Sequence, residues 1–208
     1  MKTITYNEIL YRAAEAAGRT RDNLPLGETS LLKSVFALEL NRVWTGEDWD
    51  DLRAPLLAVA LDANNAFPNP YVDANSVSTV LGEVLGVYDQ MPGGPTAWQR
   101  LEFSRAADTF TVTPKSSHPW YGNTPVPSTV YVHYQLPCPD LLAITDAAEL
   151  ATTTLPLMFG NYLALRGAAH LLAADGAASL AGVQMGLAQS QLDFERTRIQ
   201  RPAWCKPA

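Results

Sequence analysis

The order of segment types along the chain limits its fold more than any single motif. Alanine- and leucine-rich stretches with helical periodicity occupy both ends of the sequence. Between them, from about residue 98 to 139, a proline- and threonine-rich stretch carries the two-residue alternation of strands. We therefore expect an α+β fold: a helical bundle, made of an N-terminal helix pair and a C-terminal helical hairpin, with a small antiparallel β block inserted in the middle.

The expected boundaries divide the chain into four parts. Residues 1–46 form the helix pair and residues 47–140 a strand-rich block with long loops. Residues 141–200 form the helical hairpin, which packs with 1–46 as one helical domain, and 201–208 are a short tail. With 208 residues, 47% of them apolar, the chain has enough material for such a core.

Local signals mark the first helix pair. Thr5 and Glu8 have the spacing of a capping box, and Gly18 is placed to end the helix that follows. Apolar residues at helical spacing predict a second helix over 32–44 that ends before Gly46. Two helices joined by so short a loop should pack antiparallel.

The middle of the chain predicts strands less evenly. Apolar runs over 56–61 and 80–88 are too short for periodicity to assign, and we favour strands for both. The Asn- and Pro-rich stretch 64–70 predicts a loop. Clear alternation predicts a hairpin over 100–104 and 109–113, and a third strand over 130–134, with a long loop over 114–127.

The C-terminal stretch predicts a helical hairpin. Apolar residues recur at helical spacing over 155–172 and again at Leu180, Val183, Leu187 and Phe194. Many alanines along both helices would let them approach closely. Arg196 and Arg198 suit the negative C-terminal end of the second helix.

Composition argues against several functions. A net charge of -6 disfavours broad electrostatic binding to nucleic acid, although a local basic patch stays open. Cys138 and Cys205 lie far apart and suggest neither a disulfide framework nor a metal knuckle, so we interpret both as free thiols in a reducing compartment. The sequence shows neither an apolar run long enough to span a membrane nor a signal peptide, which predicts a cytosolic origin.

The sequence contains no recognisable catalytic or metal-binding motif. His118, His133 and His170 have no metal-binding spacing, and we interpret them as structural or exposed. Asp48, Asp50 and Asp51 lack the spacing of a calcium loop and are better explained as a solvated loop or a helix start. We therefore expect no catalytic residue, no metal and no cofactor, and do not expect an enzyme.

Three aromatic residues are candidates for contact with a ligand or a partner protein. Trp120 and Tyr121, on the Pro/Gly/Ser-rich loop, predict either a carbohydrate or partner contact or rings that cap the sheet, and the sequence leaves both open. Trp204 lies so close to the chain end that a partner subunit is one way to bury it.

Four segments together carry a family resemblance. They are 6–10 with 31–44, then Trp98 to Phe103 (WQRLEF), then Val130 to Pro137 (VYVHYQLP), and finally the helical hairpin over 157–198. Their order resembles the head-tail adaptor (connector) proteins of tailed bacteriophages, and the resemblance covers most of the chain.

The resemblance implies a structural virion protein made in the host bacterial cytoplasm and located in the neck, between capsid and tail. It implies a ring of twelve copies that binds the portal protein and tail or neck proteins, and a channel through which DNA passes without specific binding. It implies no cofactor and no membrane. Seven residues are candidate interface residues on this interpretation: Trp120, Tyr121, Arg196, Arg198, Arg201, Trp204 and Lys206.

Two alternatives stay open. Another phage neck or tail-completion protein would differ from an adaptor in its stoichiometry and its position in the particle. A cytosolic carbohydrate- or ligand-binding module, using Trp120 and Tyr121, belongs to a different class and would bind glycans in a way that Trp120→Ala abolishes.

Overall fold

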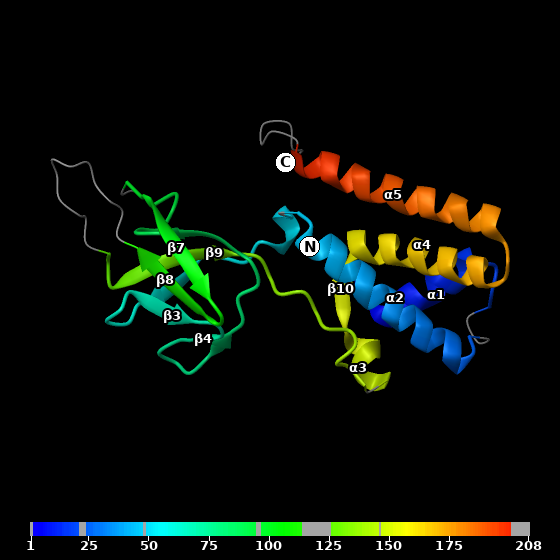
Figure 1. Ribbon diagram of the computed structural model, residues 1–208, viewed down its shortest axis with the longest axis horizontal. Helices are drawn as coiled ribbons and strands as arrows, with labels where there is room; N and C mark the ends of the chain where they lie inside the picture. Colours follow the sequence, from blue (N-terminus) through cyan, green and yellow to red (C-terminus); the bar gives the residue numbers. More distant parts are fainter. Residues whose placement is uncertain are drawn as a thin grey trace. The chain divides into compact units, whose positions relative to one another are not determined.

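A computed structural model of the chain separates into two compact units (Figure 1). The first contains Met1–Asp51 and Cys138–Ala208, and the second contains Leu52–Pro137. The second unit is therefore an insertion in the first. The residues that the structure describes are 2–20, 24–47, 49–94, 97–113, 126–145 and 147–200.

The first unit contains all the α-helices of the described residues and a two-stranded antiparallel ladder. The helices are α1 (Tyr6–Ala16), α2 (Leu26–Thr45), α3 (Ala147–Thr152), α4 (Leu157–Ala174) and α5 (Ala178–Gln200). The ladder joins β1 (Thr3–Thr5) to β10 (Thr154–Pro156). The structure adds α3, β1 and β10 to the elements expected from sequence.

The expected start and end of α1 are confirmed. The Thr5 hydroxyl accepts a hydrogen bond from the Glu8 backbone N–H at 3.2 Å, and the Glu8 carboxylate accepts one from Arg12 at 3.2 Å. Gly18 follows the helix with a φ of 75°, in the left-handed region that glycine adopts at little cost. The second helix also ends before Gly46, but it begins at Leu26, earlier than expected.

Helix α4 is the centre of the helical unit. At Gly167 three helices meet: a Cβ there would lie 2.7 Å from the Phe36 ring of α2 and 3.1 Å from Ala13 Cβ of α1. Near the start of α4, the Phe159 ring packs against Trp44 and edge-on against Trp49, with centroids 5.3 and 5.2 Å apart. These close approaches fix α1 and α2 on α4.

The second unit is built on a six-stranded antiparallel sheet with the order β2-β9-β6-β7-β8-β3. Its strands are β2 (Leu57–Ala60), β3 (Ala66–Pro68), β6 (Val84–Tyr88), β7 (Arg100–Ala106), β8 (Thr109–Thr113) and β9 (Thr129–Tyr134), and a separate ladder pairs β4 (Tyr71–Val72) with β5 (Ser78–Thr79). The two edge strands, β2 and β3, are consecutive in the chain. The sheet therefore curls back on itself and nearly closes into a barrel.

The expectation of a helical bundle with a small β insert is wrong. The sheet is the main element of a unit with its own buried core, which includes Val59, Phe67, Val87, Phe110 and Val132. Sequence periodicity underestimated it for two reasons. β3 lies in the Asn- and Pro-rich stretch that predicts a loop, and its pairing with β8 is a long-range contact. The third predicted strand, β9, pairs with β2 and β6 and not with the hairpin before it.

Two turns in this unit share one sequence pattern, Asp-Ala-Asn-polar-apolar, and one geometry. They begin at Asp62 and Asp73, and each carboxylate accepts hydrogen bonds from the backbone N–H groups two and four residues further on, all at 2.8 Å. The fourth residue of each turn, Asn65 or Ser76, has a positive φ of 57° or 64°. These turns explain how short strands in a Pro-rich stretch reverse direction tightly enough to pair.

Candidate functional site

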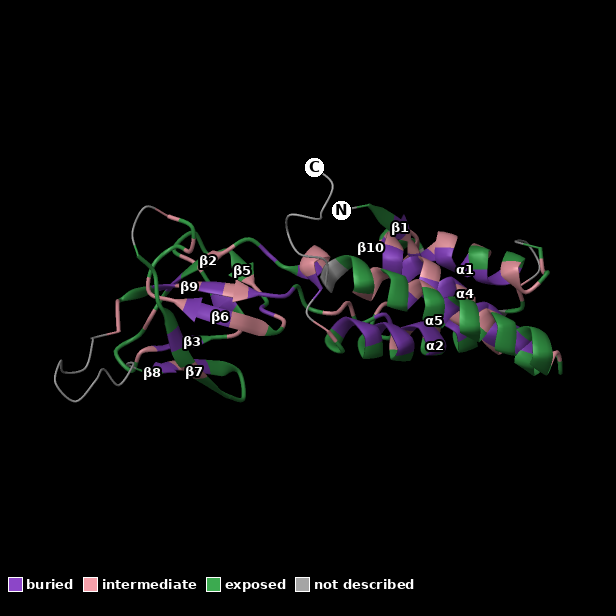
Figure 2. Cartoon of the chain, turned by 90° about the horizontal axis from the view of Figure 1, so that it is seen from above, coloured by how far each residue is buried: buried purple, intermediate pink, exposed green. Residues whose placement is uncertain are grey.

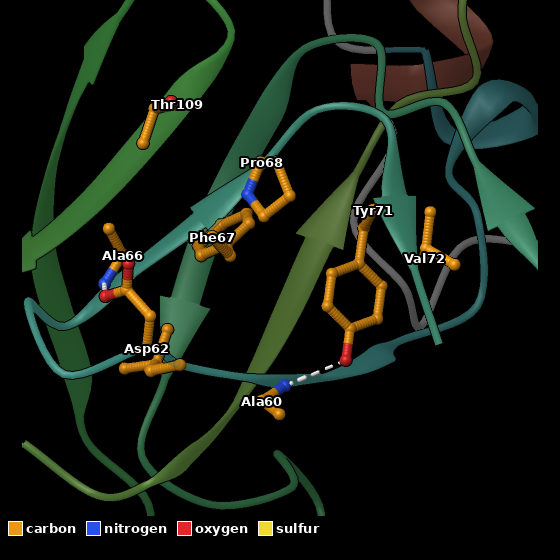
Figure 3. A pocket seen from close by; sticks show the side chains of 9 residues that line it. Ala60, Asp62, Ala66, Phe67, Pro68, Tyr71, Val72 and Thr109 are labelled. Atoms are coloured by element: carbon orange, nitrogen blue, oxygen red, sulfur yellow. Dashed lines mark hydrogen bonds between the residues drawn. The ribbon is translucent and has the colours of Figure 1, made fainter. Parts of the chain in front are cut away.

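A hollow of about 460 Å³ on the β unit offers no reactive group (Figure 3). Its lining includes the Phe67 and Tyr71 rings. The Tyr71 hydroxyl accepts a hydrogen bond from the Ala60 N–H at 3.0 Å, and the Asp62 carboxylate is occupied in its turn. Tyr71 and Asp62 hold the local backbone, and the third polar side chain of the lining is the hydroxyl of Thr109. The hollow therefore suits an apolar contact better than acid–base or nucleophilic chemistry.

A buried polar cluster joins α2 to α4. Glu39 accepts hydrogen bonds from the Tyr162 hydroxyl, at 2.6 Å, and from Arg166. Burial by itself would raise the pKa of Glu39, but the bonds from Tyr162 and Arg166 outweigh it and hold this pKa below its ordinary value. Burial, followed by the bond to Glu39, raises the pKa of Tyr162 to about 12. Because these bonds tie α2 to α4, we interpret the cluster as structural.

The other chemical candidates stay apart. Among the described residues, no three His, Cys, Asp or Glu side chains gather closely enough to hold a metal ion. His133 lies on β9 and His170 on α4, in different units, whereas His118 and Asp48 fall outside the described residues. Asp51 pairs with Arg198 at 2.6 Å. No described helix has the length and apolar character needed to cross a membrane.

Helix α5 presents the most unusual surface of the helical unit. It is buried along a single line, formed by Ala181, Ala188 and Leu192, and most of its remaining surface is exposed (Figure 2). The apolar residues that predict this helix lie in the exposed surface: Val183 is 58% exposed and Phe194 is 61% exposed. These larger residues are therefore not the packed face of the helix, because the small alanines take the contact with α4.

We call one exposed row the α5 seam: Leu180, Val183, Leu187, Ser190 and Phe194. On an ideal helix its centre is about 140° around the axis from the buried line, so it faces away from α4. The fifteen residues from 178 to 192 contain no charged side chain. A solvated helix face normally carries charge, so this surface has the composition of one that another protein covers.

A second uncharged row lies on α2. We call it the α2 seam: Leu31, Ser34, Leu38, Asn41 and Thr45, all exposed. Leu38 is 72% exposed. Beside this row runs a groove of about 420 Å³, which we call the α2 groove; it is lined by Ser34, Ala37, Leu38, Asn41 and residues 138–142. Burial raises the pKa of the Cys138 thiol in this groove to about 11, with a smaller effect from Asp140.

The ends of α2 and α5 show that these helices run in the same direction. Arg19 binds both Glu28, at the start of α2, and Asp175, at the end of α4, so α2 and α4 are antiparallel. The short turn at Gly176 makes α4 and α5 antiparallel as well. The end of α5 then returns to the end of α2, where Arg196 pairs with Glu47.

Of the seven predicted interface residues, two form ion pairs within the helical unit and five lie outside the described residues. Arg196 pairs with Glu47 and, at 3.0 Å, with Asp193, and Arg198 pairs with Asp51 and with a carboxylate one turn earlier in α5. Both arginines therefore hold the end of α5 within the unit. The remaining five lie outside the described residues: Trp120, Tyr121, Arg201, Trp204 and Lys206.

Sequence reasoning missed the two seams. A usable signal was present for α5, because the uncharged run from 178 to 192 also includes Gly182 and Gly186, and a Cβ at either glycine would touch nothing. The α2 seam has a weaker signal, since only two of its five residues are apolar.

The chain matches no model of a known protein family, and no curated protein is significantly similar to it in sequence.

Proposed function

We propose that this chain is a structural subunit of a bacteriophage neck: a head-to-tail adaptor that assembles as a ring between portal and tail and lines part of the DNA channel. The observation that carries the proposal is the α5 seam. A largely exposed helix with fifteen successive uncharged residues is unfavourable in water. Such a helix suits a subunit that functions inside an assembly, where a neighbour covers it.

Two further features agree with this role. The α2 seam supplies a second uncharged surface on the same unit, and an open or ring-shaped assembly needs two different contact surfaces on each subunit. The net charge of -6 suits a channel that must pass DNA without gripping it, because each phosphate contact adds salt-dependent affinity. The order of sequence features, which resembles head-tail adaptors, supplies the particular assembly and the number of twelve copies.

Cryo-microscopy of the particle tests the proposal directly. We expect density for this chain as a ring between portal and tail, and we expect particles that lack it to contain filled heads without joined tails. A chain located elsewhere in the virion, or absent from it, would contradict the adaptor function.

A cheaper test deletes the C-terminal segment of the chain, residues 201–208. Deleting residues 201–208 should leave heads filled but reduce their joining to tails, if this segment docks on the portal. Joining at the wild-type level would show that these residues are dispensable, and would leave the position of the ring to the microscopy.

A further inference from the structure

The two seams have the same spacing. Positions 31, 34, 38, 41 and 45 on α2 and positions 180, 183, 187, 190 and 194 on α5 both advance by three, four, three and four residues. This is the spacing of the contact positions of a two-stranded coiled coil, in which alternate steps of three and four keep one row facing a partner helix. Each seam faces away from α4, and all of its residues are exposed.

We propose that the α5 seam of one copy packs in parallel on the α2 seam and groove of the neighbouring copy. The proposal rests on the proposed function in one respect, namely that the neighbour is another copy of this chain. The contact is heterologous, so each copy uses both seams and the contact continues from copy to copy until a ring closes.

The side chains match when the two rows are aligned from their first residues. Leu31 then lies opposite Leu180 and Leu38 opposite Leu187, which makes two leucine layers. Polar residues also meet, because the fourth residues of the two rows are Asn41 and Ser190, so the amide of one lies opposite the hydroxyl of the other. A polar layer between apolar ones is a known way of fixing register in coiled coils.

The α2 groove supports the same alignment. It lies between Leu38 and the segment 138–142, where Leu142 is also exposed. In the aligned contact, Leu187 of the neighbouring copy approaches the groove at the level of Leu38. The groove therefore accepts the side chain that a simple helix pair would leave partly in water.

The direction of the helices agrees independently of the side chains. α2 and α5 run in the same direction within one copy, as the ion pairs at their ends require. A rotation about an axis along these helices preserves that direction, so α5 of one copy meets α2 of the next in parallel. A seam of four turns is smaller than a stable dimer needs, so single contacts should be weak and ring closure should strengthen them.

Complementation of two blocked variants tests this pairing. Leu187→Lys blocks the α5 seam and Leu38→Lys blocks the α2 seam, and both positions are exposed in the monomer. By sedimentation at high concentration, the wild type should associate beyond the dimer and each variant alone should remain monomeric. An equimolar mixture should form a one-to-one complex and nothing larger, because only one intact pair of seams remains. Val77→Lys, an exposed apolar site in the β unit, should associate like the wild type.

Disulfide trapping tests register and direction even if association is weak. In a chain with both natural cysteines changed to serine, Leu31→Cys with Leu180→Cys should cross-link copies, and Leu31→Cys with Phe194→Cys should not. Cross-linking of the second pair alone, a mixture that stays monomeric in the complementation experiment, or self-association of Leu38→Lys at the wild-type level would overturn the proposed contact. If microscopy finds this chain as a ring in the neck but a different cysteine pair cross-links, the proposed contact alone is refuted. If the predicted pair cross-links but the chain is absent from the neck, the adaptor function alone is refuted.

Discussion

The buried cluster around Glu39 allows the strongest quantitative prediction, because it attaches α2 to α4 and so positions the α2 seam. Glu39→Gln keeps the shape of the side chain but removes its charge and one acceptor. The amide oxygen can still accept from Tyr162 or Arg166, but the amide nitrogen then faces the other donor. This change should lower the free energy of unfolding of the helical unit.

The magnitude follows from the contacts. A hydrogen bond to a charged group contributes about 1.5–3 kcal/mol, and removing one partner of a fully buried ion pair costs about 3–5 kcal/mol. Arg166 keeps 18% of its side chain exposed, so water replaces part of its loss. We therefore expect Glu39→Gln to cost about 2–3 kcal/mol at neutral pH.

The pH dependence gives the prediction its sign. Because the pKa of Glu39 is lower in the folded than in the unfolded protein, its ionisation stabilises the fold above the unfolded pKa of about 4.3 and stops doing so as the pH falls through the folded value. The difference between wild type and Glu39→Gln should therefore shrink on acidification.

Urea unfolding followed by circular dichroism measures this difference, because the α-helices of the described residues all lie in one unit. Glu8→Gln is the matched control. It alters an exposed pair with Arg12 and should cost less than about 1 kcal/mol. Equal losses for the two variants, or a Glu39→Gln effect that does not change with pH, would refute the reasoning.

Three further predictions concern packing, turns and reactivity. Gly167→Ala should destabilise the helical unit by about 1–3 kcal/mol in urea unfolding, because the new methyl meets the α2 ring, whereas Gly182→Ala, in open space, should stabilise it by up to about 1 kcal/mol. Ser76→Gly should raise the thermal midpoint of the β unit more than Asn65→Gly does, because serine tolerates the left-handed conformation less well than asparagine; a fall for Ser76→Gly would contradict this. Alkylation of Cys138 at pH 8, followed by mass spectrometry, should be roughly tenfold slower in the folded than in the unfolded chain, since burial raises its pKa to about 11 and leaves less thiolate; equal rates would show an accessible thiolate.

Local sequence signals determined most of the helices and several strands. The Thr5 and Glu8 pair and Gly18 mark the two ends of α1 because caps are satisfied by residues within a few positions of each other. The hairpin of β7 and β8 follows in the same way from alternation and a short turn. Signals of this kind need no knowledge of the rest of the fold.

Those local signals could not predict which strands pair when the strands are far apart in the sequence. β3 contains a proline and follows two asparagines, and only its ladder with β8 makes it a strand. The Asp62 and Asp73 turns contain a repeated pattern that could have indicated tight reversals, but their partners across the sheet are not encoded nearby. The size of the sheet was underestimated for this reason.

The sequence by itself determined that residues 178–200 form a helix, and only the tertiary structure decided which side of it is buried. The apolar row at Leu180 and Val183 predicts a helix because of its spacing, and the spacing would be the same for a core or for an interface. The narrow line of Ala181 and Ala188 packs on α4 because small side chains let two helices approach closely, which leaves the larger residues in the exposed surface. That choice depends on the surface of the neighbouring helix, and it turns an apparent core face into the candidate assembly surface.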